Sequence, residues 1–102
     1  MTEKIDDLTI KYEEDGIEII KVLDKVILSR AAWSTIVFRY KQWNRGKKEY
    51  SDDKFSIRRY RKLKGQYVQQ SKFNISSVAQ AKKILDALGG WVDSLEDVDK
   101  DG

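Results

Sequence analysis

The 102-residue sequence contains no cysteine, no histidine and no proline. Without cysteine there is no disulfide and no thiol nucleophile, and without histidine the usual imidazole base and zinc ligand are missing. These absences weigh against most enzyme classes. The sequence therefore predicts a protein that is not an enzyme and that uses no metal and no other cofactor.

Long hydrophobic runs are also missing. No apolar stretch approaches the roughly 18 residues of a membrane span, and residues 1–7 lack the basic and apolar regions of a secretory signal. Hydrophobic residues make up 40% of the chain, which is enough for one small domain with a modest core. We therefore expect a soluble, cytoplasmic, single-domain protein that does not contact membranes and that gains stability by dimerising.

The charge is divided by region. Residues 25–84 hold sixteen Lys or Arg and three acids, a net charge of +13, whereas residues 1–24 and 85–102 each have a net charge of −5. Trp and Tyr residues are interleaved with the cations, which is typical of a surface that holds phosphates and stacks bases. A solvated face that resists aggregation would give a similar charge pattern. The aromatic residues favour nucleic-acid binding over this alternative.

Local patterns predict mostly strands. Residues 17–28 are largely β-branched and aliphatic, with a turn or bulge at residues 24–25. Residues 33–43 fit both helical spacing and strand alternation, and their β-branched and aromatic composition favours a strand. Residues 54–62 and 67–75 alternate on either side of a Gly65 turn, which predicts a hairpin.

A helix should follow the strands. Ser77 and Gln80 form a capping box, an apolar stripe follows at helical spacing, and Gly89-Gly90 is expected to end the helix. The predicted fold is α+β, an antiparallel sheet of about four strands followed by one C-terminal helix packed on one face. Residues 16–92 form the globular domain, flanked by a flexible acidic segment at residues 1–15 and a disordered acidic tail at residues 93–102.

The sheet face without the helix should collect the cations. Arg59 and Arg61 have the wrong parity for that face, so either a bulge redirects them or they reach around an edge. Trp33 and Trp91 are expected in the core or at a dimer contact, and Tyr67 in the core. Strand alternation assigns to the open face Arg39, Lys41, Trp43, Arg58, Tyr60, Lys62, Gln70 and Lys72.

Short segments in this order of elements carry a family resemblance: Ile17-Glu18-Ile19-Ile20-Lys21, Leu28-Ser29, Trp33, Trp43-Asn44-Arg45-Gly46-Lys47, Phe55-Ser56-Ile57-Arg58 and Lys72-Phe73-Asn74-Ile75-Ser76. Over roughly residues 17–91 the chain resembles the positive cofactor four transcriptional coactivators and their small bacterial relatives. The resemblance implies four strands and a helix, a homodimer, and binding of single-stranded DNA across the sheet in transcription or DNA maintenance. It makes Arg58 an exposed basic residue of the sheet. The family usually has Gly near the position of Phe73. This departure from the family pattern concerns how the last strand packs against the helix.

These observations together predict a homodimer that binds single-stranded DNA or RNA with little sequence preference. Trp43 and Tyr60 would stack bases. The alternative is a protein-interaction module whose basic face binds an acidic protein partner. Oligonucleotides and acidic polypeptides separate the two hypotheses, because only bases can stack. The phosphates would be held by Arg39, Lys41, Arg58, Lys62 and Lys72.

Overall fold

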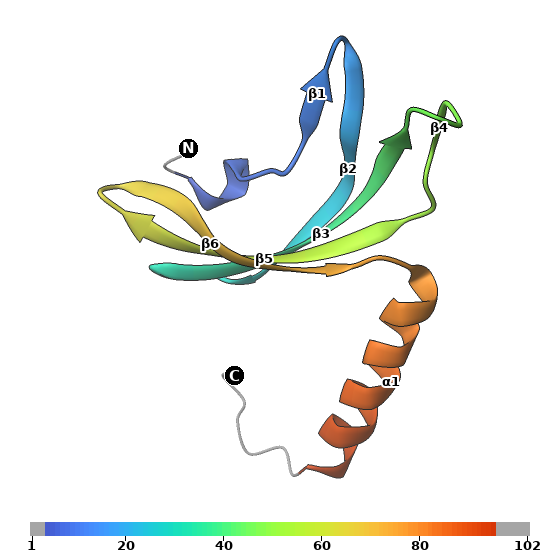
Figure 1. Ribbon diagram of the computed structural model, residues 1–102. Helices are drawn as coiled ribbons and strands as arrows, with labels where there is room; N and C mark the ends of the chain where they lie inside the picture. Colours follow the sequence, from blue (N-terminus) through green and yellow to red (C-terminus); the bar gives the residue numbers. More distant parts are fainter. Residues whose placement is uncertain (1–3, 96–102) are drawn as a thin grey trace.

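The computed structural model describes residues 4–95, which form a curled antiparallel sheet and one C-terminal helix (Figure 1). The strands run in the order β1-β2-β3-β5-β6, and β4 pairs with β3 beside this path. No helix in this part of the chain is long and apolar enough to cross a membrane. The elements are η1 (Ile5–Asp7), β1 (Tyr12–Glu14), β2 (Ile17–Ser29), β3 (Trp33–Asn44), β4 (Glu49–Tyr50), β5 (Lys54–Leu63), β6 (Gln66–Ile75) and α1 (Val78–Ser94).

The α+β class is confirmed, but the sheet has six strands rather than about four. The additional strands, β1 and β4, have only three and two residues, too few to show a pattern in the sequence. The ambiguous residues 33–43 are strand, as their composition favours. Lys64 and Gly65 both have positive φ angles, 51° and 79°, which is the geometry of a tight type I′ hairpin turn between β5 and β6.

Irregular pairing curls the sheet. The register between β2 and β3 shifts between Val22 and Asp24, close to the bulge expected at residues 24–25, and again between Ile27 and Ser29. A further shift between β5 and β6 leaves Gln70 without a partner. Such bulges increase the local twist and bend of a strand. Figure 1 shows the result, a sheet curved around the N-terminal segment, residues 4–11.

The two faces of the sheet are defined by cross-strand pairs, because directly opposed residues point to the same side. The inner face, which contacts the N-terminal segment, carries Ile36 opposite Arg58. The outer face carries Arg39 opposite Phe55, and Trp33 opposite Arg61.

The core lies between the inner face and the N-terminal segment. Ile5 and Leu8 pack there with Ile36, Phe38 and Tyr60, and Phe38 is fully buried. The segment that the sequence assigns to a flexible region at residues 1–15 thus contributes two buried side chains to the core. Apolar side chains at positions 5 and 8 tie this segment to the sheet because their burial removes them from water.

Two cations fasten the N-terminal segment to the sheet. Lys25 Nζ donates hydrogen bonds to the carbonyl oxygens of Asp6, at 2.5 Å, and Leu8, at 2.7 Å. Arg30 Nη2 lies 3.0 Å from Asp6 Oδ1. Part of the basic charge of β2 and of the β2–β3 turn thus holds the protein's own N-terminus.

The helix begins as predicted but ends later and packs differently. Ser77 is the N-cap, and its side chain accepts a hydrogen bond from the Gln80 amide at 3.1 Å. The helix then continues through Gly89-Gly90 to Ser94, so residues 93–94 belong to it rather than to a tail. The remainder of the predicted tail, residues 96–102, lies outside the described part.

No residue of α1 is buried, so the prediction that the helix packs on one face of the sheet is wrong for this chain by itself. The chain leaves the end of β6 and α1 projects away from the outer side of the sheet (Figure 1). Its apolar stripe remains in solvent, and Trp91 is 66% exposed.

Candidate nucleic-acid interface

A cavity of about 560 Å³ lies between the N-terminal segment and the inner face. This volume is in the range of pockets that hold small organic ligands. The sheet contributes Arg58 and Lys72, which are direct partners on β5 and β6. The remaining walls carry aromatic and amide side chains, including Tyr40, Tyr60, Tyr67, Gln69 and Asn74, and the N-terminal side contributes Lys11 and Tyr12.

Neutral groups hold Arg58 in place. Its Nε donates to Ser56 Oγ at 2.7 Å, and its Nη1 donates to Gln69 Oε1 at 2.8 Å. Ser56 Oγ in turn donates to Asn74 Oδ1 at 2.7 Å. These partners fix the guanidinium without cancelling its charge.

The side chain of Lys72 forms no hydrogen bond and no ion pair with any other residue in the described range 4–95. Two like charges directly opposite each other on paired strands are unfavourable. An anion bound between Arg58 and Lys72 would relieve this repulsion, which makes the pair the strongest anion site on the inner face.

The tyrosines of the cavity differ in how much ring they offer. Tyr60 is only 5% exposed and belongs to the core, and this burial raises the pKa of its hydroxyl, with Arg58 opposing the shift. Tyr67 is half-buried, with Lys62 Nζ 5.6 Å from its ring centroid. The Tyr67 hydroxyl donates to the Ala31 carbonyl oxygen at 3.4 Å. Tyr67, rather than Tyr60, has ring surface available to a base.

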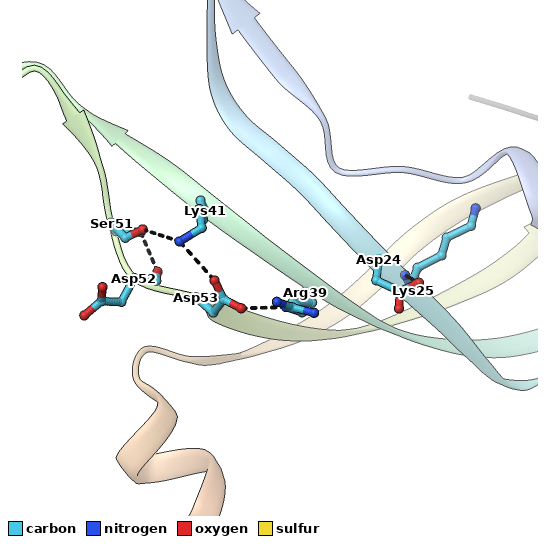
Figure 2. A network of polar contacts seen from close by, with 7 residues as sticks. All are labelled: Asp24, Lys25, Arg39, Lys41, Ser51, Asp52 and Asp53. Carbon is cyan, nitrogen blue, oxygen red and sulfur yellow. Dashed lines mark hydrogen bonds and ion pairs between the residues drawn. The ribbon is translucent and has the colours of Figure 1, made fainter.

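The outer-face cations Arg39 and Lys41 share one carboxylate partner, Asp53 (Figure 2). Arg39 Nε donates to Asp53 Oδ2 at 2.6 Å, and Lys41 Nζ lies 3.1 Å from Asp53 Oδ1. The hydrogen bond from Arg39, followed by that from Lys41, lowers the pKa of Asp53 below its usual value. Both cations therefore already have a carboxylate partner at neutral pH.

Trp43 is also engaged within the protein. Its ring packs edge-on against Tyr50, with centroids 5.0 Å apart, and Lys21 Nζ lies 5.4 Å from the Tyr50 centroid. The Tyr50 hydroxyl donates to the Glu18 carbonyl oxygen at 2.9 Å. This cluster ties β4 to β2 and β3 and leaves the Trp43 ring less free than an open stacking platform.

The structure thus divides the predicted site between two faces. The alternation within β3 and within β5 is as predicted, but the phase between the two strands is wrong. Ile36 pairs with Arg58 and Arg39 pairs with Phe55, and a one-residue shift in pairing exchanges the faces of a strand. Arg58, Tyr60, Lys62 and Lys72 lie on the inner face, whereas Arg39, Lys41 and Trp43 lie on the outer face.

The unpaired Gln70 explains a second difference. It changes the phase of β6, so Tyr67 shares the inner face with Arg58 instead of sharing a face with Phe73. Tyr67 still packs against the core, as predicted. Arg59 and Arg61 follow the regular alternation of β5, so neither a bulge in that strand nor an edge is needed to place them on the outer face.

Sequence reasoning did not find Tyr40 as part of the site, although it shares the parity of Phe38 and therefore the inner face. Lys11 and Tyr12 were also missed, because Lys11 lies in the N-terminal segment and Tyr12 begins the three-residue strand β1, which shows no pattern in the sequence. Within the described residues, no cluster of three or more acidic side chains could hold a metal ion.

No protein-family model, curated protein or solved structure matches this chain. The resemblance to the positive cofactor four coactivators therefore stays a prediction.

Proposed function

We propose that the protein binds single-stranded nucleic acid at its inner face, with little sequence preference. The observation that supports this most is the pair Arg58 and Lys72, which lacks an acidic partner in the described part of the chain and opens into the 560 Å³ cavity beside Tyr67. A single strand offers both a phosphate for the cations and an unstacked base for the ring. Duplex DNA does not expose the flat faces of its bases.

The residues have separate roles in this proposal. Arg58 gives forked hydrogen bonds to phosphate oxygens, because its guanidinium is already oriented by Ser56 and Gln69. Lys72 adds a mobile charge. Tyr67 stacks on a base, an interaction that contributes about 1–3 kcal/mol. Contacts to the backbone and to a ring face carry little base information, hence the low sequence preference.

Fluorescence anisotropy of labelled 20-mers tests this function. The single strand should bind more tightly than the duplex. The log of its association constant should fall with log salt at a slope of about −2, as about three phosphate contacts give for a single strand. A polyglutamate of equal charge should bind more weakly because it cannot stack. No binding of single strands at low salt would refute the proposal, and preferential binding of polyglutamate would support a module that docks an acidic protein.

We also propose that two copies form a homodimer through α1 and the outer face. The helix exposes Leu85, Leu88 and Trp91, and the outer face exposes Val26 and Phe73, the latter by 55%.

A second copy is the occupant that satisfies both apolar surfaces at once. In a two-fold arrangement, α1 of each copy covers the apolar part of the other copy's outer face, around Val26, Val37 and Phe55. Both apolar surfaces are then buried by one closed interface, and the end of the outer face that carries Trp33 stays open. The outer face offers an apolar hollow of about 210 Å³ bordered by Val26, Val37 and Phe55. Sedimentation velocity should show a dimer for the wild type and a monomer for Leu88→Lys. Lys83→Gln, a polar change on the same helix, serves as the control. For an expected dissociation constant of about 5 μM, a protein concentration of about 50 μM is roughly tenfold higher and should give mostly dimer. A wild type that is monomeric at this concentration would contradict the dimer.

A further inference from the structure

Trp33 lies between two arginines on the outer face. The Arg59 guanidinium carbon is 4.4 Å from the Trp33 ring centroid, and that of Arg61 is 5.1 Å away. The register explains the cluster, since Trp33 is opposite Arg61 and Arg59 is opposite the next outer-face residue of β3. Trp33 remains 39% exposed, so the cluster is open to solvent.

Neither arginine is neutralised. Across residues 4–95, the side chains of Arg59 and Arg61 form no ion pair and no hydrogen bond, whereas Arg39 on the same face is paired with Asp53. A cation–π contact restrains a guanidinium but uses none of its five N–H donors. The cluster therefore presents two restrained guanidinium groups with unused donors next to an accessible indole ring.

We infer that the cluster of Trp33, Arg59 and Arg61 is a second binding site for nucleic-acid phosphates. Planar guanidinium groups match phosphate oxygens in a bidentate manner, and both Arg59 and Arg61 are restrained by the same Trp33 ring. The exposed part of Trp33 can contact a sugar or a base beside the bound phosphate. This inference rests on the proposed function, because it takes the same ligand.

The Trp33 cluster lies on the opposite face of the sheet from the inner-face site. Arg58 and Arg59 are neighbours on β5 but point to opposite faces of the sheet. A strand bound at the inner face leaves the Trp33 cluster unoccupied, so a single chain can hold two strand segments, one on each side. The protein would then bridge strands rather than only coat them.

A capture experiment tests the bridge. A biotinylated 20-mer is immobilised, the protein is added, and retention of a second, fluorescent 20-mer is measured. Wild-type protein should retain the second strand. Arg59→Gln/Arg61→Gln should bind the first strand within about twofold of wild type but lose at least about fivefold in retention of the second, since only the outer guanidinium contacts are removed.

Lys47→Gln/Lys48→Gln is the matched control, because it removes the same charge in the turn between β3 and β4. This control variant should retain the second strand. A dimer with two inner faces could also capture a second strand, so the comparison is made with Leu88→Lys added to every protein, which should make it monomeric. Retention by Leu88→Lys/Arg59→Gln/Arg61→Gln equal to that of Leu88→Lys alone would overturn the inference.

Trp33 fluorescence gives a direct readout. In a Trp43→Phe/Trp91→Phe protein, Trp33 is the sole tryptophan. Its emission should change when an oligonucleotide is added, and the change should persist after Arg58→Gln/Lys72→Gln removes the inner-face cations. Retained oligonucleotide binding with unchanged Trp33 emission would refute only the second site. Loss of all binding by the wild type would refute the proposed function itself.

Discussion

Arg58 and Lys72 on the inner face and Arg39 and Lys41 on the outer face are two cation pairs on the same sheet, but they differ in their partners. Asp53 contacts both outer cations, whereas the inner pair has only neutral partners in the described part of the chain. The aromatic residues differ as well, because Phe38 and Tyr60 of the inner face are buried in the core, whereas Trp33 of the outer face is exposed. Whether a cation is available to bind an anionic ligand therefore depends on its partners in the fold. The number of basic residues alone does not show this.

The largest expected effect is on the free energy of unfolding, which should fall more when an inner-face ring is removed than when an outer-face ring is removed. Tyr60→Ala should lower the free energy of unfolding by about 3–5 kcal/mol, because it removes a buried ring from the core. Trp33→Ala should cost about 1 kcal/mol, since its ring is partly exposed on the outer face. Urea denaturation measures both changes. A Trp33 variant that is less stable than the Tyr60 variant would show that the core lies on the other face.

The next effect concerns stacking. Tyr67→Ala should weaken single-strand binding by about 1–3 kcal/mol, whereas Tyr67→Phe should retain most of the wild-type affinity because it keeps the ring. Trp43→Ala should change the affinity much less, since Trp43 packs on Tyr50 on the other side of the sheet. A greater loss for Trp43→Ala in the same titrations would place the base contact on the outer face.

A smaller effect should follow from freeing the outer cations. Asp53→Asn leaves Arg39 and Lys41 without their carboxylate, so we expect oligonucleotide affinity at low salt to rise by about two- to fivefold. The gain should disappear at high salt, where exposed charges are screened. Unchanged affinity at low salt would mean that Asp53 does not limit these two cations.

The same carboxylate gives a pH dependence. Because the folded-state pKa of Asp53 lies below its usual 3.8, its ionised form stabilises the fold above about pH 4, and this contribution is lost as the pH falls through the folded pKa. Melting temperatures of wild type and Asp53→Asn should therefore differ at pH 6, and they should converge as the pH falls below the folded-state pKa of Asp53, where the carboxylate is protonated. A difference that persists at the lower pH would assign the effect to something other than this ionisation.

Local chemistry was sufficient for several elements. The β-branched and aromatic run predicted β3, the Gly65 turn predicted the hairpin of β5 and β6, and the Ser77 cap predicted where α1 begins. Each of these signals involves residues that are close in the sequence. They are consequently readable without knowledge of the rest of the fold.

The composition of each face was not readable in this way, because it depends on which residues meet across strands. The pairing of Ile36 with Arg58 and the unpaired Gln70 each change the phase of a strand by one residue, and no local pattern marks either. The role of Ile5 and Leu8 was hidden by the acidic residues around them. Helical periodicity predicted the apolar stripe of α1, but it does not show which surface the stripe packs against, because that depends on residues far away in the sequence.

The central claim is that the inner face, rather than the basic composition as a whole, binds nucleic acid. Its most direct test compares two variants that each lose two positive charges, Arg58→Gln/Lys72→Gln and Arg39→Gln/Lys41→Gln, in titrations of one labelled single strand at low salt. The first should weaken binding by at least about tenfold and the second by no more than about threefold, because only the first removes charges without an acidic partner. Equal losses, or a greater loss for the outer pair, would contradict the account.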